Sequence, residues 1–256
     1  MKDGGLLFTL GVAFIGGILF SFATAYSLAS KKNSDENALA ALERAQSQAA
    51  NVAYGIGVVF RRDSGISVRQ SEDGVSLSGT LPNRMTGYVS RVKRLAEFSK
   101  SALAGVDVRL DEPPTVVTAF GVNFTQIDET TSEAVLPYDA TEVAFAGETA
   151  QDAGGCSVAS EPGRLKVSVD VRGNPPCAKE VLVNGSGKAF FDLSGDGKVT
   201  MALEDGLLTV KNTGVFPLNY TLTVVVNESR LRPPPKLGGV VSSEVLGCVG
   251  RSEVLL

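Results

Sequence analysis

Residues 4–30 restrict how this chain can fold more than any other stretch, because they include no charged residue. A helix needs about 20 mostly apolar residues to cross the hydrocarbon core of a bilayer. This stretch is long enough, and it is rich in Leu, Ile, Phe, Ala and Gly. A secretory signal has a shorter apolar core followed by small residues. Residues 6–20, followed by Ala-Thr-Ala at 23–25, also match that pattern. A retained membrane helix and a cleaved signal are therefore both open.

The first residues, "MKDGGLLFTL", have a short polar head with Lys2, then glycines, then the apolar run. Over residues 1–30 this order resembles the class III signal of archaeal type IV pilins and pilin-like envelope proteins. The resemblance implies that a dedicated peptidase cuts just before the apolar helix and leaves that helix on the protein. It further implies that the helix either stays in the bilayer or packs in a filament core.

Two sequence signals disagree about which side of a membrane the rest of the chain occupies. Lys31 and Lys32 follow the apolar run, and positive charge after a membrane helix favours the cytoplasm. Asp35 and Glu36 dilute that charge. Four N-x-[S/T] sequons favour the outside, since such sites are modified only there. They are Asn123, Asn184, Asn219 and Asn227. We expect the bulk of the chain to be extracellular.

The composition favours a protein without enzymatic activity. The 256 residues include no His, which is the commonest general base and the commonest metal ligand. The formal net charge of −4 argues against nucleic acid as a partner, since nucleic-acid binders usually carry a basic patch. No nucleophile elbow, phosphate loop or paired metal motif is present. We therefore predict no catalytic residue.

The three cysteines lie far apart and form no CxxC pair, which excludes zinc-type and thioredoxin-type spacing. Outside the cytoplasm, Cys156 and Cys177 would close a loop of about twenty residues, and a disulfide there would contribute roughly 3 kcal/mol. Cys248 would then be the odd cysteine, either buried or paired between molecules. The alternative is three unpaired structural cysteines.

Two amphipathic helices are predicted behind the apolar stretch. From Ser34 onward, apolar residues recur every three or four positions, which is typical of one buried helix face. They are Leu39, Leu42, Ala45, Ala49, Val52, Ile56 and Phe60. This helix would pack against a globular head, as in pilins, or be an ordinary core helix. Residues 83–103 form the second predicted helix, whose Arg and Lys side chains we expect to face solvent.

Short strands are predicted for most of the remaining chain. Alternating residues on both sides of Asp73-Gly74 predict a hairpin, and residues 106–110 and 115–127 are strand-like. Beyond Asp128, Val-rich runs separated by turn residues predict an antiparallel sandwich. Its strands are expected at 164–171, 199–203, 207–210, 220–226 and 240–246. Residues 206–226 resemble a strand–turn–strand unit of immunoglobulin-like modules, which implies a fold and no particular function.

One motif resembles a site. Asp192, Ser194 and Asp196, followed by Gly197, match the first half of a Ca²⁺ loop, in which alternating oxygens surround a hard cation. The twelfth position, which should be glutamate, is Leu203. The two interpretations are a β-turn and a weak external Ca²⁺ site, which is the single cofactor candidate.

Together these observations predict an α+β fold with an N-terminal transmembrane helix extended by an amphipathic helix, a small α+β region and a C-terminal antiparallel β-sandwich. The predicted divisions are residues 1–32, 33–127 and 128–256.

The predicted function is a membrane-anchored extracellular structural protein, a pilin-like subunit or minor pilin of an archaeal-type surface filament. The alternative is a single-pass or secreted binding or adhesion protein with an immunoglobulin-like module; an envelope enzyme without His is a third hypothesis. Expected partners are membrane lipid, further copies of the chain, and other envelope or pilus proteins. The expected location is the cell membrane with a single pass, or a surface filament.

Overall fold

The computed structural model describes residues 14–15, 17–19, 21, 34–83, 85–103, 105–152, 157–174, 176–184, 187–227 and 233–256. The helices are α2 (Ser34–Asp63) and α3 (Met85–Ala102). The strands are β1 (Ser67–Gln70), β2 (Gly74–Leu81), β3 (Val106–Leu110), β4 (Thr115–Val117), β5 (Asn123–Gln126), β6 (Thr131–Val135), β7 (Ala140–Asp152), β8 (Ser157–Ser160), β9 (Pro162–Asn174), β10 (Cys177–Val183), β11 (Lys188–Asp192), β12 (Val199–Glu204), β13 (Leu207–Asn212), β14 (Leu218–Val226), β15 (Lys236–Val245) and β16 (Cys248–Leu255).

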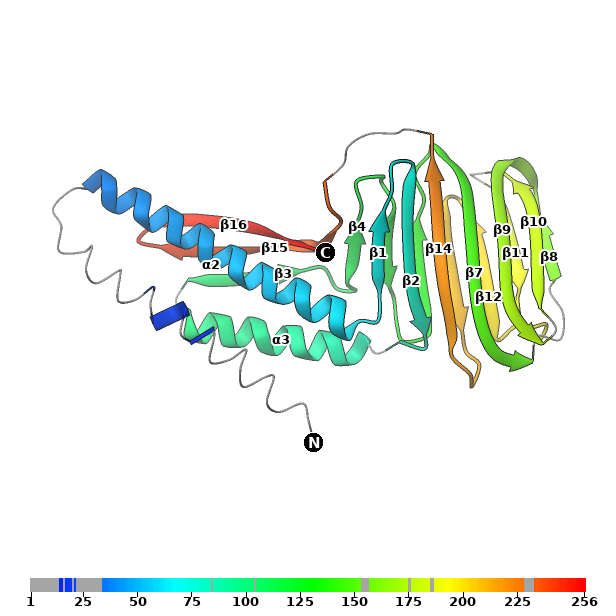
Figure 1. Ribbon diagram of the computed structural model, residues 1–256, viewed down its shortest axis with the longest axis horizontal. Helices are drawn as coiled ribbons and strands as arrows, with labels where there is room; N and C mark the ends of the chain where they lie inside the picture. Colours follow the sequence, from blue (N-terminus) through cyan, green and yellow to red (C-terminus); the bar gives the residue numbers. More distant parts are fainter. Residues whose placement is uncertain are drawn as a thin grey trace.

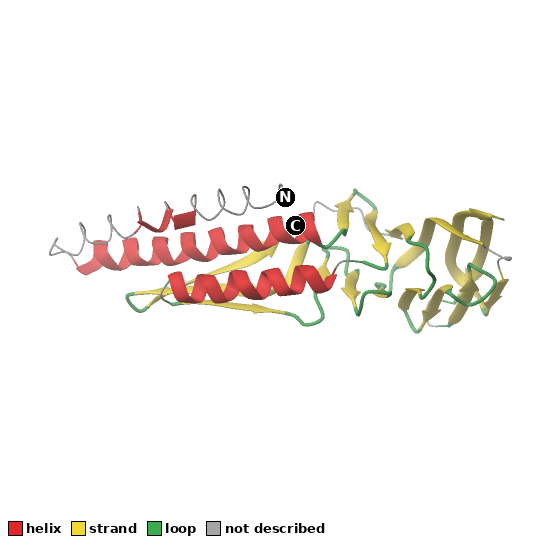
Figure 2. Cartoon of the chain, turned by 90° about the horizontal axis from the view of Figure 1, so that it is seen from below, coloured by secondary structure: helices red, strands yellow, loops and turns green. Residues whose placement is uncertain are grey.

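The molecule is elongated, with a helical stalk at one end and a β-sandwich head at the other (Figure 1). In the stalk, α2 and α3 lie side by side along β3, β15 and β16 (Figure 2). In the head, a six-stranded sheet of order β1-β2-β14-β7-β9-β10 faces the strands β4-β5-β6-β13-β12-β11-β8 of a ten-stranded sheet. Apolar side chains alternate along these strands and fill the space between the two sheets.

One strand, β15, belongs to both parts. Lys236 and Leu237 pair with β4 of the head, and residues 239–243 pair with β3 of the stalk. The pairing of β15 with β16 shifts its register between Leu237 and Val241. Gly239 lies within this irregularity at a φ of +124°, and a Cβ atom there would lie 2.3 Å from the carbonyl oxygen of Arg109. The bend therefore requires glycine.

Helix α2 covers β16 at very short range because small residues meet at the contact. Ala45 and Ala49 are fully buried, and a Cβ on Gly250 would lie 2.3 Å from the backbone nitrogen of Gln46. The Gln46 side chain donates to the carbonyl oxygen of Arg251 at 2.8 Å and accepts from its N–H at 3.1 Å. An edge strand otherwise exposes such groups, so α2 protects this edge.

A chain of polar groups crosses the head interior. The Tyr220 hydroxyl on β14 donates to Ser132 Oγ on β6 at 3.1 Å, and Ser132 Oγ donates to buried Gln126 at 2.7 Å. Burial raises the pKa of Tyr220 to about 12, so this hydroxyl stays protonated and able to donate. At one end of the head, the fully buried Asn212 amide donates to the carbonyl oxygens of Leu81 and Phe216 at 2.8 and 2.9 Å. These bonds hold the two sheets in a fixed relation.

The predicted fold class is wrong. Among the described residues, strands make up 52% and helices 24%, and the strands form two sheets, so this part of the chain is β-rich. The residues before Asp128 look like a separate α+β region in the sequence because long-range strand pairing leaves no local signal. In the structure β2 pairs with β14, and both β3 and β4 pair with β15. Both sheets therefore contain strands from either side of the boundary predicted at 127/128.

The predicted transmembrane helix and single-pass location in the cell membrane are also corrected. No helix among the described residues is long and apolar enough to cross a membrane. Most of residues 4–30 lie outside the described part of the chain. Of those described, Phe14 and Ile18 pack against the protein core, and the Phe14 ring lies 5.9 Å from that of Phe98 on α3. These apolar side chains thus contact protein.

Several local predictions are confirmed. The hairpin at Asp73-Gly74 exists, with β1 and β2 antiparallel, and β3 spans the residues predicted for it. The strands expected beyond Asp128 correspond to β9, β12, β13, β14 and β15, but the predicted all-antiparallel pairing is wrong, because β9 pairs with β7 in parallel. The buried stripe of α2 includes Ala45 to Phe60 as predicted, but Leu39 and Leu42 are exposed and Ala41 is buried in their place.

Replacing Gly239 by alanine should lower the free energy of unfolding by about 1–3 kcal/mol, because a side chain cannot adopt this φ without strain. Gly87→Ala on α3 is the matched control, since a Cβ atom added there would meet nothing within 4 Å; it should be neutral or stabilising by about 0.5–1 kcal/mol. Thermal and chemical unfolding measure both. Wild-type stability of Gly239→Ala would contradict the role assigned to the β15 bend.

Candidate functional site

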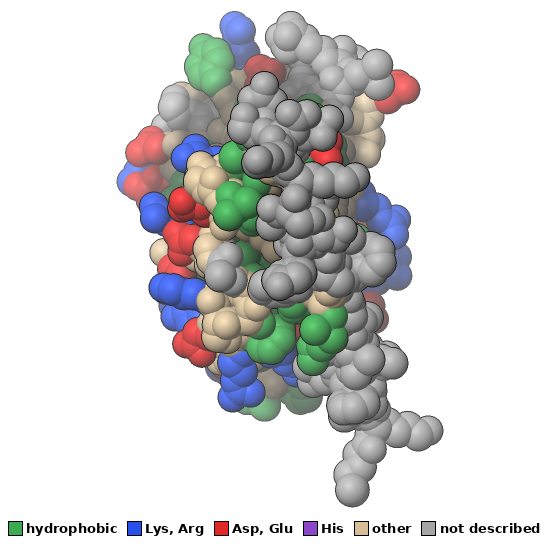
Figure 3. Space-filling model, turned by 90° about the vertical axis from the view of Figure 1, so that its left-hand side faces the viewer, with side chains coloured by type: hydrophobic (Ala, Val, Ile, Leu, Met, Phe, Trp, Pro, Cys, Tyr) green, Lys and Arg blue, Asp and Glu red, His purple; other side chains and the backbone are tan. Residues whose placement is uncertain are grey.

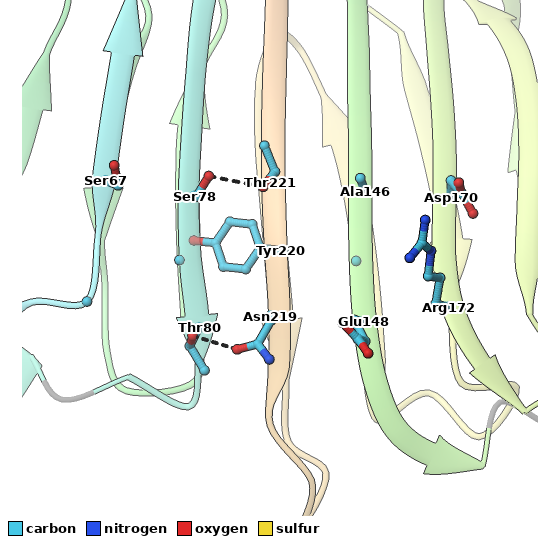
Figure 4. Close-up of a pocket in the computed structure, with 13 residues that line it drawn as sticks. Ser67, Ser78, Thr80, Ala146, Glu148, Asp170, Arg172, Asn219, Tyr220 and Thr221 are labelled. Atoms are coloured by element: carbon cyan, nitrogen blue, oxygen red, sulfur yellow. Dashed lines mark hydrogen bonds between the residues drawn. The ribbon is translucent and has the colours of Figure 1, made fainter.

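The outer face of the six-stranded sheet contains a shallow, open hollow of about 440 Å³. It lies over β2, β14, β7 and β9, at the level of Tyr220 (Figure 4). Because strand side chains alternate between faces, Tyr220 points into the head while Asn219 and Thr221 point outward. The hollow is therefore built by residues that the core does not use.

Cross-strand register arranges the outward side chains in two neighbouring rows. One row consists of Ser78, Thr221, Ala146 and Asp170. The other consists of Thr80, Asn219, Glu148 and Arg172. Ala146 on β7 has the smallest side chain in either row, so the hollow is deepest there. It lies between the hydroxyl side chains of β2 and β14 and the charged side chains of β9.

Hydrogen bonds fix the hydroxyl side of the hollow. Ser78 Oγ and Thr221 Oγ1 are 3.0 Å apart, and Thr80 Oγ1 donates to Asn219 Oδ1 at 2.8 Å (Figure 4). On the charged side, Glu148, Asp170 and Arg172 form no ion pair with any described residue. The hollow thus offers both hydrogen-bond donors and acceptors to a polar ligand.

The Ca²⁺ candidate loop forms a hydrogen-bonded turn. Asp192 Oδ1 accepts from the backbone N–H of Ser194, Gly195 and Gly197 at 3.3, 2.9 and 3.2 Å. This one carboxylate oxygen is thus the acceptor for three backbone donors within the turn, which is the arrangement of a hydrogen-bonded Asx turn. Asp196 is bound to the ammonium of Lys198 at 2.6 Å. This geometry favours the β-turn interpretation.

The same contacts explain the titration of Asp196. The Lys198 side chain, with the hydroxyl of Ser194, lowers the pKa of the Asp196 carboxyl to about 2. The carboxylate is therefore charged at all ordinary pH values and already neutralised by a lysine. Among the residues that the structure describes, no three His, Cys, Asp or Glu side chains are grouped as a metal site would need.

The four sequons lie in different surroundings. Asn123 lies in β5, half-buried, with a buried Oδ1 that has no hydrogen-bond partner among the described residues. Asn184 follows β10 and Asn227 follows β14, and both are exposed. Asn219 is exposed on β14, inside the hollow. Glycosylation at these positions stays a prediction.

The cysteines are only partly described. Cys177 is disulfide-bonded and buried, whereas Cys156 lies outside the described residues, so the predicted Cys156–Cys177 pairing stays a prediction. Cys248 is free and half-buried. Its Sγ donates to the carbonyl oxygen of Ala38 at 3.6 Å, which places the β15–β16 turn against the start of α2.

Exposed leucines flank that contact on both elements, and we call them the apolar end: Leu39 and Leu42 of α2 and Leu246 of the β15–β16 turn. Their exposed fractions are 59%, 44% and 82%. Figure 3 faces this end of the molecule and shows hydrophobic side chains grouped among charged ones. Exposed apolar groups of this kind typically mark an interaction surface.

Leu246 is unusual in conformation as well as in exposure. Its φ is +52°, and Gly247 follows at +80°. A two-residue hairpin turn with two positive φ values strongly favours Asn-Gly or Asp-Gly, and a branched residue there costs about 1–2 kcal/mol. Neither the local conformation nor burial accounts for a leucine at this position.

Neither surface is predicted from the sequence. The hollow is hidden there because β2, β7, β9 and β14 are far apart in the chain, although serine, threonine and alanine at every second position of 76–80, 144–146 and 221–223 are a visible signal. The apolar end is hidden because Leu39 and Leu42 fit the apolar stripe predicted for the buried face of the helix.

Comparisons with protein-family models, curated proteins and solved structures return no match for this chain.

Replacing Asp192 by alanine should lower stability by about 1–3 kcal/mol, since three backbone donors lose a charged acceptor. Millimolar Ca²⁺ should not change the melting temperature of the wild type. Asp139→Ala is the control, since Asp139 is an exposed turn residue whose side chain has no hydrogen bond within the described residues. A rise in melting temperature with Ca²⁺ that is lost in Asp192→Ala would instead establish a cation site.

Proposed function

We propose that this chain is a non-enzymatic, extracellular structural subunit that associates with further copies of itself through the apolar end, in the manner of pilin-like surface proteins. The observation that carries the proposal is Leu246, which combines 82% exposure with a left-handed turn conformation. A second copy of the chain is the partner that would bury it.

The chain order supports this choice of partner. Residues 4–30 carry no charge and lead into α2, which begins at Ser34, a few residues before Leu39 of the apolar end. The first turns of α2 therefore present exposed apolar side chains close in the chain to an apolar stretch, and the Cys248–Ala38 contact adds the β15–β16 turn to the same end. In a two-fold symmetric dimer, the same surface of the two subunits meets. The apolar end of one copy would then be buried against the apolar end of another.

The stalk and the disulfide are consistent with a structural role outside the cell. Helix α2, with 30 residues, is held along β16 by buried alanines and by the two hydrogen bonds of Gln46. This gives a stiff element with the apolar end at its tip. The disulfide at Cys177 is the kind of bond that persists in oxidising compartments.

Leu246→Asn should stabilise the folded subunit while weakening its association. Asparagine tolerates a positive φ, so the melting temperature should rise by about 2–4 °C, and removal of the exposed leucine should shift the sedimentation profile toward the monomer. Asp205→Asn is the matched control, because Asp205 also has a positive φ, +50°, but lies at the β12–β13 turn of the head. Association that is unaffected by Leu246→Asn would contradict the proposal.

The double variant Leu39→Glu with Leu42→Glu tests the α2 side of the apolar end. Both side chains are exposed, so the fold should be retained, whereas charge on an apolar interface should abolish association in sedimentation velocity and any ordered assembly in electron microscopy. Ser47→Glu, on an exposed position of the same helix, should associate like the wild type. Equal loss in both variants would point to a nonspecific charge effect and overturn the assignment.

A further inference from the structure

Among the four sequons, Asn219 has surroundings that distinguish it from the others. It lies within the hollow, whereas Asn184 and Asn227 follow strands β10 and β14, and Asn123 is half-buried. It is also fixed in orientation, because Thr80 Oγ1 donates to its Oδ1 at 2.8 Å. Figure 4 shows that the amide nitrogen consequently points away from Thr80, toward β7. That nitrogen is the atom to which an N-linked sugar is attached.

We propose that Asn219 carries an N-linked glycan and that the hollow is the seat of its first sugars. In the transfer, a bond forms between Asn219 Nδ2 and C1 of the first sugar. The bond from C1 to the leaving oxygen of a glycosyl pyrophosphate donor breaks, Nδ2 gives up one proton, and the pyrophosphate leaves with the electron pair. The donor and the transferase belong to the exporting cell, and the chain supplies the acceptor.

The row that contains Asn219 provides partners for a sugar laid across it. Glu148 is the direct cross-strand neighbour of Asn219, and Arg172 is the neighbour of Glu148. Strands are about 4.8 Å apart, so Arg172 lies about 10 Å from Asn219 along the row. Sugar hydroxyls can donate to the carboxylate and accept from the guanidinium, and neither side chain has an ion-pair partner among the described residues.

The floor of the hollow fits this arrangement. Ala146 in the adjacent row leaves room above β7, between Thr221 and Asp170. Two carboxylates and one guanidinium line this side, so the hollow favours a neutral polyhydroxylated ligand over an anion. The chain's own glycan is a ligand of this kind that is covalently delivered to this place.

The test uses the full chain from a host that exports and N-glycosylates it, with glycopeptide mass spectrometry at each sequon. We expect a glycan at Asn219 and none at Asn123. An unmodified Asn219 would overturn the proposal. This inference rests on the proposed function only for the exported location of the chain. The measurement detects the glycan itself, so a protein that carries the glycan at Asn219 but does not associate would contradict the proposed function alone.

Seating is tested by the double variant Glu148→Ala with Arg172→Ala, measured in the glycosylated and in the enzymatically deglycosylated protein. We expect the melting temperature to fall by about 2–4 °C in the glycosylated form and to stay unchanged in the deglycosylated form. Asn227→Gln is the control: enzymatic removal of the glycan should change the melting temperature of this variant by as much as it changes that of the wild type. Equal shifts in both forms of the double variant would show that the sugar does not touch the hollow.

Discussion

The bend of β15 at Gly238 and Gly239 is the constraint on which the rest of the structure depends. On one side of it the strand pairs with β4 in the head, and on the other with β3 in the stalk. Because the same strand also pairs with β16, it carries the surface on which α2 lies. A side chain at Gly239 would meet the carbonyl oxygen of Arg109. The stalk and the head therefore form one body through a strand that only glycine allows to bend.

This body has two surfaces at separate places, and they differ in chemistry. The apolar end at the tip of the stalk consists of exposed leucines, one of them held in a strained turn. The hollow on the head consists of hydroxyls, an amide and charged groups on a regular strand lattice. Apolar surface favours contact with protein, and the polar hollow favours a hydroxylated ligand. An assembly contact at the tip of the stalk would leave the hollow on the head free.

Local structure could be predicted from the sequence where the signal is local. The Asp73-Gly74 hairpin and β3 depend on turn residues and on alternation within a few positions, and they occur as predicted. The layer to which a strand belongs is a long-range property. Residues 206–226 do form two strands separated by a turn, as predicted, yet these strands, β13 and β14, join different sheets, and the buried Asn212 amide bonds to Leu81 of β2. The hollow depends on such long-range pairings. The sequence could therefore single out Asn219 as a sequon but could not show which residues of β2, β7 and β9 lie beside it.

Hydrogen–deuterium exchange of the full chain, measured below and above the concentration at which it associates, tests self-association through the apolar end most directly. Association at that surface predicts new protection in residues 37–46 and in the 244–249 turn, with exchange of the sheet face at 144–148 and 219–223 unchanged. Protection that appears over the sheet face and spares the stalk tip, or no concentration-dependent protection at all, would contradict it.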